Sequence, residues 1–370
     1  MEQTRSANLL LALVFLMVIA VEPILQLTHD LRKGATPLAF GVFSRTPSAT
    51  NLRAFEETLR DQSILANTVR PYVQYWRYAS MGDLGRNGVL GREDWLFYRP
   101  GIQFLVEPWG DIEATEPLTA IVSFRDQLRA QGIELLVVVV PGKESVHPEY
   151  ITTRAPRFSG SHVTDFVDDL RELEVEAMYL RPDEAQRVGP PKYLKQDTHW
   201  TPGYAQECAN LVAARALALG WIELGSAAYG TQSKPVQRHG DILRMAKSQP
   251  LLESIHKEKF EAIQVTEPDS LEHYKDSPDA SVLVLGDSFL RIFERDEPGS
   301  AGFVSHLARA LQQPVTSLIN DGGASTLVRM ELRRKPELLR GKKLVIWEFV
   351  DRDLRFGMEG WQEIEIPAPN

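Results

Sequence analysis

The sequence contains very little cysteine and no excess of basic residues. Cys208 is the only cysteine in 370 residues, which excludes an internal disulfide and a cysteine-rich metal site. Lysine and arginine number 41 against 50 aspartates and glutamates, so the formal net charge is −9. A nucleic-acid binder needs a basic face to displace counterions, and this charge balance argues against that class and predicts no nucleic-acid partner. The 8 histidines include no H-x₃-H pair, so we predict no metal site.

The remaining composition is that of an ordinary soluble globular protein. Hydrophobic residues make up 43% of the chain and charged residues 25%. These fractions exclude disordered, collagen-like and multi-span membrane classes. We find no internal repeat and no low-complexity segment. The chain is long enough to bury a large core, either as one large domain with appendages or as two domains.

A single long apolar segment lies near the N-terminus. The unbroken run Leu9–Val21 is followed by further apolar residues as far as Leu27. About 20 residues are needed to span a membrane, so the run alone is typical of a signal peptide and the whole segment is long enough for an anchor. We expect an uncleaved signal-anchor or transmembrane segment over residues 1–28. A cleaved signal peptide ending near Ala20 and a buried core helix are the alternatives.

The rest of the chain predicts an α/β domain. Residues 29–80 are expected to form a linker and an N-terminal helix, residues 81–356 the domain, and residues 357–370 a C-terminal tail. Continuous apolar runs predict buried strands at 134–140, 281–285, 315–319 and 344–349. Segments with helical spacing are found at 118–130, 163–174, 202–219, 302–311 and 327–339. This alternation predicts a sheet of mostly parallel strands with helices on both faces, and we expect 225–275 to be irregular.

A Gly-Asp-Ser sequence follows one of the predicted central strands. Ser288 lies just after the strand 281–285, at the sheet edge where active sites of open α/β sheets are found. Its hydroxyl could face solvent while its backbone N–H faces a developing oxyanion. The alternative is a strand-end turn in which Asp287 caps the next helix.

An aspartate and a histidine two residues apart form a second candidate. Asp197 and His199 would point the same way from an extended segment, just before a helix that begins near Pro202. A carboxylate could then hold one imidazole nitrogen while the other faces a nucleophile, as in a Ser-His-Asp triad. The alternative is a surface histidine with a local hydrogen bond to aspartate.

Several further polar residues lie near predicted strand ends. Lys143 follows the strand 134–140 and could bind an anionic group, or could be a solvated loop lysine. Arg291 and Arg352 are expected to be structural. His239-Gly240-Asp241 is similar to a second Asp/His arrangement, but it lies in the irregular region and is interpreted as the end of a turn.

Taken together, the two motifs resemble a known enzyme family. Asp197-Thr198-His199-Trp200 about ninety residues before Gly-Asp-Ser288-Phe resembles the AlgJ/AlgX-type alginate O-acetyltransferases of the SGNH-hydrolase superfamily. Ordinary SGNH enzymes carry the Asp/His pair after the serine, so the order here matches only this branch. Weaker resemblance extends over residues 91–98, 139–146 and 347–349, and the whole likeness covers about residues 80–355.

This resemblance implies the fold and the site. The fold would be SGNH-hydrolase-like. Ser288 would be the nucleophile, His199 the general base, and Asp197 the residue that orients His199. The oxyanion hole would combine the Ser288 N–H with donors from the loop that contains Asn320, Gly322 and Gly323, and Lys143 is a candidate substrate-binding residue. No cofactor is expected.

The function implied is an exported, membrane-anchored polysaccharide O-acetyltransferase that forms an acetyl-serine intermediate and acts in the modification of an exopolysaccharide. A carbohydrate acetyl-esterase and a non-catalytic carbohydrate-binding assembly subunit are the alternatives. The partners would be the polysaccharide acceptor and a multi-span membrane acyltransferase that relays the acetyl group. The expected location is the inner membrane, with one N-terminal span and the catalytic domain in the periplasm. A net charge of −9 would repel a polyanion unless basic residues such as Lys143, Arg291 and Arg352 gather at the sheet edge.

Overall fold

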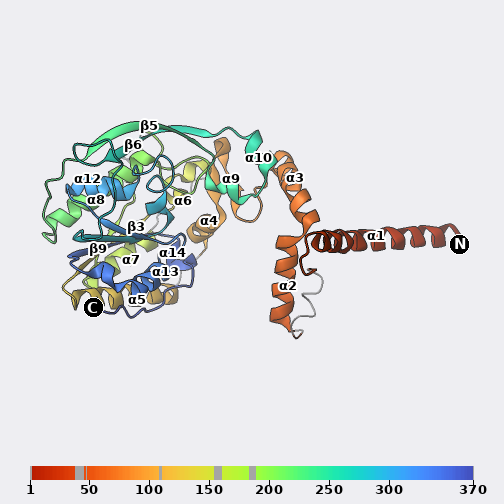
Figure 1. Ribbon diagram of the computed structural model, residues 1–370, viewed down its shortest axis with the longest axis horizontal. Coiled ribbons are helices and arrows are strands. Elements are labelled where there is room, and N and C mark those ends of the chain that lie inside the picture. Colours follow the sequence, from red (N-terminus) through yellow and green to blue (C-terminus); the bar gives the residue numbers. More distant parts are fainter. Residues whose placement is uncertain are drawn as a thin grey trace. The chain divides into compact units, whose positions relative to one another are not determined.

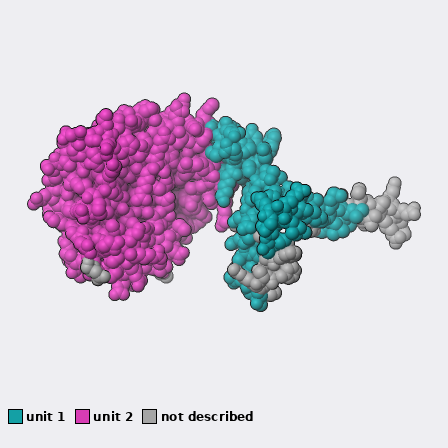
Figure 2. Space-filling model, in the orientation of Figure 1, with its two compact units in different colours: residues 1–83, 246–255 teal, residues 84–245, 256–370 magenta. Residues whose placement is uncertain are grey.

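The protein divides into two compact units. The computed structural model describes residues 2–37, 46, 48–107, 111–153, 161–182 and 189–369. Unit 1 consists of residues 1–83 and 246–255, and unit 2 of residues 84–245 and 256–370 (Figure 2). The chain therefore leaves unit 2 after Met245 and returns to it at His256.

Unit 1 is helical. It contains α1 (Glu2–Arg32), α2 (Ala49–Gln62), α3 (Ile64–Met81) and α10 (Gln249–Ser254). Helical spacing from residue 51 to about 78 is interrupted because the Ser63 side chain accepts a hydrogen bond from the Ala66 N–H at 3.0 Å, which starts a new helix. The short helix α10 packs on α3, where Leu251 is buried and the Ser248 hydroxyl donates to the Pro71 carbonyl.

The N-terminal apolar run lies inside α1. Described side chains of this run, such as Leu11 and Met17, are exposed. Within the described part of the chain, no helix has the length and apolar character required to cross a membrane. The membrane anchor over residues 1–28 stays a prediction.

A five-stranded parallel sheet forms the centre of unit 2, as the sequence predicts. Its order is β4 (Glu176–Tyr179), β3 (Glu134–Val140), β9 (Leu344–Val350), β7 (Val282–Gly286) and β8 (Thr316–Ile319). Every pairing in it is parallel, so all carboxyl ends lie at one edge. The short edge strand β4 was not predicted, because its four residues carry no continuous apolar run.

Helices cover both faces of this sheet (Figure 1). One face packs against α8 (Pro202–Ala218) and α12 (Phe303–Leu311), and the other against α5 (Asp111–Arg129), α7 (Ser161–Glu172) and α13 (Leu327–Arg334). Successive strand residues enter opposite cores, since Leu136 and Val138 belong to the first and Leu135 and Val137 to the second. Burial on both faces explains why these strands are continuous apolar runs.

Two antiparallel pairs accompany the sheet. One is the hairpin of β1 (Gly88–Leu90) and β2 (Leu96–Tyr98), and the other a ribbon of β5 (Gly230–Arg238) and β6 (Glu258–Thr266). The prediction of an irregular 225–275 region was wrong for this ribbon. In β5 only Val236 is buried, so the strand shows no apolar pattern.

Short helices connect these elements. They are α4 (Arg99–Val106), α6 (Lys143–Val146), α9 (Asp241–Met245), α11 (Ser288–Arg291) and α14 (Asp353–Phe356), with 3₁₀ turns at Arg92–Asp94, Pro148–Tyr150 and Pro336–Leu339.

The C-terminal segment after α14 packs onto unit 2. Trp361, Ile364 and Ile366 are buried in the core on the α5 side of the sheet.

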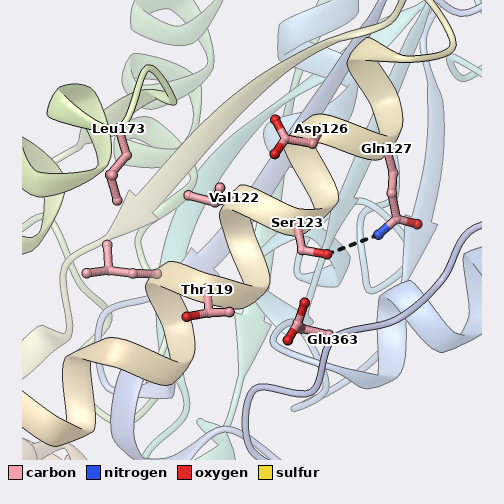
Figure 3. Close-up of a pocket in the computed structure, with 8 residues that line it drawn as sticks. Thr119, Val122, Ser123, Asp126, Gln127, Leu173 and Glu363 are labelled. Carbon is pink, nitrogen blue, oxygen red and sulfur yellow. Dashed lines mark hydrogen bonds between the residues drawn. The ribbon is translucent and has the colours of Figure 1, made fainter.

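A surface groove of about 620 Å³ runs along α5, beside the C-terminal segment (Figure 3). The groove is lined by Leu118, Thr119, Val122, Ser123, Asp126, Gln127, Leu173 and Glu363, none of which is a predicted site residue.

Candidate active site

Ser288 lies at the carboxyl edge of the sheet. β7 ends at Gly286, and Ser288 is the first residue of α11 and is half-buried. Asp287 caps α11, since its Oδ1 accepts from the Phe289 N–H at 2.8 Å, as the alternative interpretation expects. The turn requires glycine at 286, because a Cβ there would lie 2.3 Å from Oε2 of the buried Glu348.

The Asp197–His199 segment brings its side chains to this serine. His199 Nε2 lies 2.8 Å from Ser288 Oγ, and His199 Nδ1 lies 2.6 Å from Asp197 Oδ1. Asp197 is fully buried and His199 is 4% exposed. The segment ends at Thr201, whose side chain caps α8 by accepting from the Tyr204 N–H. Two motifs 89 residues apart thus form one continuous chain of hydrogen bonds from the Ser288 hydroxyl to the Asp197 carboxylate.

Asp197 and His199 each stabilise the charged form of the other. Burial alone would raise the pKa of Asp197, but the charge and hydrogen bond of His199, with Arg238, lower it below its ordinary value. Burial alone would lower the pKa of His199, but the Asp197 charge and hydrogen bond raise it above its ordinary value. Asp197 therefore stays ionised and favours protonation of the imidazole.

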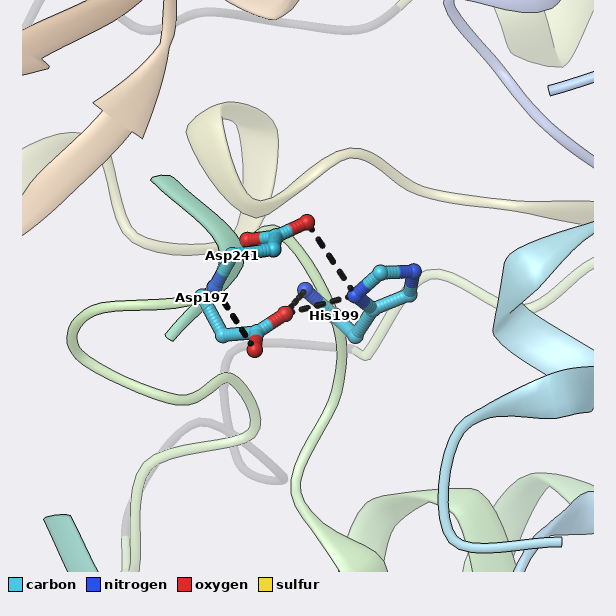
Figure 4. A group of neighbouring side chains, drawn as sticks. All are labelled: Asp197, His199 and Asp241. Atoms are coloured by element: carbon cyan, nitrogen blue, oxygen red, sulfur yellow. Dashed lines mark hydrogen bonds and ion pairs between the residues drawn. The ribbon is translucent and has the colours of Figure 1, made fainter. Parts of the chain in front are cut away.

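A second carboxylate, that of Asp241, lies near the same imidazole. Ligand atoms of Asp197, His199 and Asp241 lie within 4.8 Å of one another, close enough to surround a cation (Figure 4). However, the 2.6 Å contact between His199 Nδ1 and Asp197 Oδ1 requires a shared proton, since two lone pairs would repel at that distance. That nitrogen is therefore a hydrogen-bond donor, and the arrangement suits acid–base chemistry better than metal binding.

Lys143 is buried rather than presented to a ligand. Its Nζ donates to the carbonyls of Leu96 at 2.6 Å, Lys195 at 2.8 Å and Asp197 at 3.0 Å. The ammonium also lies 4.9 Å from the centre of the Trp95 ring. Burial lowers the pKa of Lys143 to about 8. All three N–H groups are used, so Lys143 fixes the backbone of the Asp197 segment and is not free to bind an anion.

The predicted oxyanion loop follows β8. The Asn320 N–H donates to the Gly286 carbonyl and the Gly323 N–H to the Asn320 carbonyl, each at 3.0 Å. The Asn320 side-chain amide lies 3.5 Å from Glu331 Oε2. Within the described part of the chain the Gly322 N–H donates to no acceptor, and Gly322 has a φ of +68°, which favours glycine. The loop begins beside the strand that carries Ser288.

The basic residues expected at the sheet edge are matched by acids. Arg291 Nη1 and Nε pair with Asp296 and Asp321. Arg352 is surrounded by carboxylates, which raise its pKa although burial would lower it; these are Asp353, Glu144, Asp287 and Asp351. A polar pocket of about 430 Å³ beside Arg238 is lined by Val236, Arg238, Arg244, Arg291, Asp296 and Glu297. Lys143, Arg291 and Arg352 therefore do not form an unpaired basic surface.

Sequence reasoning missed residues that support the Asp197 segment. Glu258 on β6 accepts from the Lys195 and Gln196 N–H groups at 2.6 and 2.9 Å. Arg238 on β5 lies 3.6 Å from Asp197 Oδ2. Both come from the ribbon that was expected to be irregular, so no pattern linked them to the site. Asp241 was considered as part of a second Asp/His arrangement with His239, but was interpreted as the end of a turn.

Comparison with known proteins shows the family of the chain. The family model described as "SGNH hydrolase-like domain, acetyltransferase AlgX" matches residues 89–351, more than half of the chain. The chain belongs to this family. Its class is therefore that of an SGNH-like O-acyltransferase, and the resemblance inferred from the two motifs is confirmed.

Relatives of this AlgX-type chain include proteins named as probable alginate O-acetylases AlgJ. That of Pseudomonas fluorescens is 25% identical over 283 residues, which cover 73% of this chain and 69% of the relative. That of Pseudomonas putida is 26% identical over 290 residues, covering 73% and 71%. The solved O-acetyltransferase domain of Pseudomonas putida AlgJ has the same fold, with a TM-score of 0.59 and 23% identity over 73% of this chain and 93% of that domain.

Proposed function

We propose that the chain transfers acetyl groups to hydroxyls of an extracytoplasmic polysaccharide through an acetyl-Ser288 intermediate. The observation that carries this proposal is the continuous hydrogen-bonded chain from Ser288 Oγ through His199 to Asp197, at 2.8 and 2.6 Å. In a family of acetyltransferases, such a chain has the composition and the distances of a Ser-His-Asp triad.

The first half of the reaction would load the serine. His199 Nε2 takes the proton of Ser288 Oγ as that oxygen attacks the acetyl carbonyl of the donor. A bond forms from Oγ to the acyl carbon, and the bond from that carbon to the donor oxygen breaks. The imidazolium then returns its proton to the departing donor oxygen.

The second half would transfer the acetyl group to sugar. His199 Nε2 takes the proton of an acceptor hydroxyl, whose oxygen attacks the acetyl-serine carbon. The ester bond to Ser288 breaks, and the proton passes from the imidazolium to Oγ. In both halves the oxyanion would be held by the Ser288 N–H and by donors of residues 320–323. Among these the Gly322 N–H is the backbone candidate, because it has no acceptor among the described residues.

The donor and the location form part of the same proposal. A multi-span membrane acyltransferase would present the acetyl group, and the apolar run Leu9–Val21 would hold the chain at the membrane with unit 2 in the periplasm. The support is the length of the N-terminal apolar segment together with the alginate O-acetylase names of the relatives.

Trapping of the acyl-enzyme tests the proposal directly. Incubation with an activated acetyl ester and rapid acid quenching should leave an acetyl group on the peptide that contains Ser288, as seen by mass spectrometry. Ser288→Ala should give no acetylated peptide from this region. Acetylation that survives at the same level in Ser288→Ala would overturn the assignment. Acetate release with and without added oligosaccharide then separates transfer to sugar from hydrolysis.

Activity should fall as the solution is acidified. The base form of His199 is neutral, and Asp197 raises the pKa of His199 although burial lowers it. The acid limb of kcat/KM is therefore expected above the ordinary imidazole value of about 6.5. Initial rates across a pH series would measure it. A limb at or below that value would contradict the raised pKa.

A further inference from the structure

A second carboxylate faces the imidazole nitrogen that Asp197 binds. Asp241 begins α9, and its Oδ2 lies 3.5 Å from His199 Nδ1, while Asp197 Oδ1 lies 2.6 Å from the same nitrogen (Figure 4). Asp241 is 44 residues beyond Asp197 in sequence. The imidazole is thus placed against two acids from separate elements, only one of which belongs to the Ser-His-Asp arrangement.

Asp241 also holds the residue between the two members of the pair. Its Oδ1 accepts from the Thr198 N–H at 2.8 Å, and its Oδ2 accepts from the Thr198 hydroxyl at 2.6 Å. The same hydroxyl lies 3.1 Å from His199 Nδ1. The backbone N–H and the hydroxyl of Thr198 are therefore both bound to one carboxylate, which fixes the backbone between Asp197 and His199.

The backbone around Asp241 closes over Asp197. The Asp241 N–H donates to Asp197 Oδ2 at 3.1 Å, and Arg238 Nη2 lies 3.6 Å from that oxygen. This approach requires glycine at 240, because a Cβ there would lie 1.9 Å from the Gln196 carbonyl oxygen. The segment that follows β5 therefore packs against the Asp197 segment, and Asp197 is completely buried.

We propose that Asp241 is a positioning residue of the reaction, which fixes the Asp197–His199 segment through Thr198 and adds a second negative charge beside the His199 imidazolium. This inference rests on the proposed role of His199 as the base. When the Oγ–H bond of Ser288 breaks and the Nε2–H bond of His199 forms, the new positive charge faces two carboxylates instead of one. The transition state that leads to this ion pair is stabilised in the same way.

The surrounding charges influence the pKa values of His199 and Asp241. Groups that act on His199, Asp197 and Asp241 are Arg238 on β5, Lys143 on α6, Glu258 on β6 and Asp287 before α11. Burial and the neighbouring Asp197 charge raise the pKa of Asp241 to about 6. The Asp241 charge in turn contributes to the raised pKa of His199. Removing that charge is therefore expected to lower the pKa of His199.

Asp241→Asn removes the charge and keeps an oxygen that can accept from the Thr198 N–H. We expect the imidazole of His199 to titrate about one pH unit lower in this variant, and kcat to fall about tenfold with little change in KM. Nuclear magnetic resonance of the ring measures the titration without turnover. The titration therefore tests the role of Asp241 even if no acetyl-Ser288 forms. Absence of acetyl-Ser288 would overturn the proposed function and not this inference.

A matched control is available in Asp276. Its carboxylate accepts from the N–H and the hydroxyl of a single residue, Ser317, at 2.8 and 2.5 Å, so it binds one residue as Asp241 binds Thr198. Asp276→Asn should leave both the His199 titration and kcat as in the wild type. A wild-type His199 titration and kcat in Asp241→Asn would overturn the inference.

A second measurement covers the case in which Asp241→Asn does not fold. In the wild-type protein, the chemical shift of the Asp241 carboxyl carbon should follow a titration near pH 6, because burial and the neighbouring ionised Asp197 raise the pKa of this carboxyl. The same transition should appear in the chemical shift of the His199 ring. An Asp241 carboxyl that titrates near the ordinary aspartate value of about 4, with no effect on the His199 ring, would overturn the inference.

Discussion

Ser288→Ala is expected to lower kcat for acetyl transfer by about 10⁶-fold, since the variant loses the oxygen that we propose carries the acyl group. His199 would remain beside the site with no hydroxyl to deprotonate at the 2.8 Å position. Transfer from an activated acetyl ester to an oligosaccharide, followed by chromatography of the product, measures the loss. The double variant with His199→Ala should be little worse than Ser288→Ala alone, because residues that act as one unit are not additive.

Ser281→Ala provides the control for this prediction. Ser281 lies just before the same strand, β7, but at the opposite edge of the sheet, and its hydroxyl donates to Gln313 Oε1 at 2.9 Å. Its replacement removes one hydrogen bond far from Ser288 and His199 and should leave kcat within about twofold of the wild type. Equal losses in the two variants would show that Ser288→Ala acts on folding and not on chemistry.

Lys143→Met is expected to lower the free energy of unfolding by about 3 kcal/mol or more. Methionine fills a similar volume, but the carbonyls of Leu96, Lys195 and Asp197 lose their common donor inside the protein. Each buried acceptor left without a partner costs about 1–3 kcal/mol. Urea unfolding followed by circular dichroism would measure the change. Acetyl transfer should also fall, because one of these carbonyls belongs to Asp197.

The control for Lys143→Met is Lys335→Met. Lys335 is half-exposed and pairs with Glu331 one helical turn away, at 2.8 Å. Surface pairs of this kind contribute at most about 1 kcal/mol, so this variant should unfold almost as the wild type does. A Lys143→Met protein as stable as the wild type would mean that the three carbonyls find other donors, and that Lys143 does not hold the segment.

The central sheet could be predicted because its strands are buried on both faces. The run over residues 134–140 is apolar at every position but the first and is followed by Pro141-Gly142, and β3 has those bounds in the structure. The β5–β6 ribbon could not be predicted in the same way. Most of its side chains are exposed or half-buried and Pro235 lies within it, so alternation of apolar and polar residues is absent.

The site was predicted as far as local motifs extend. Asp197 and His199 are two residues apart, and Ser288 directly follows an apolar strand, so each carries a local signal. Lys143 was expected near the surface, because sequence does not show that three carbonyls converge on its ammonium. The contacts of Asp241 and Glu258 with the Asp197 segment span 43 to 63 residues and depend on a ribbon without a sequence pattern.

The departure of the chain from unit 2 at residues 246–255 has a practical consequence for recombinant work. A protein shortened to begin at Leu84 would lose α3, and α10 would then present Leu251 to solvent and lose the Ser248–Pro71 hydrogen bond. An expression clone for unit 2 alone therefore needs two edits, removal of residues 1–83 and replacement of 246–255 by a short glycine-serine linker. The linker must leave Asp241 and Glu258 in place, because these residues flank the excision and hold the Asp197 segment from either side.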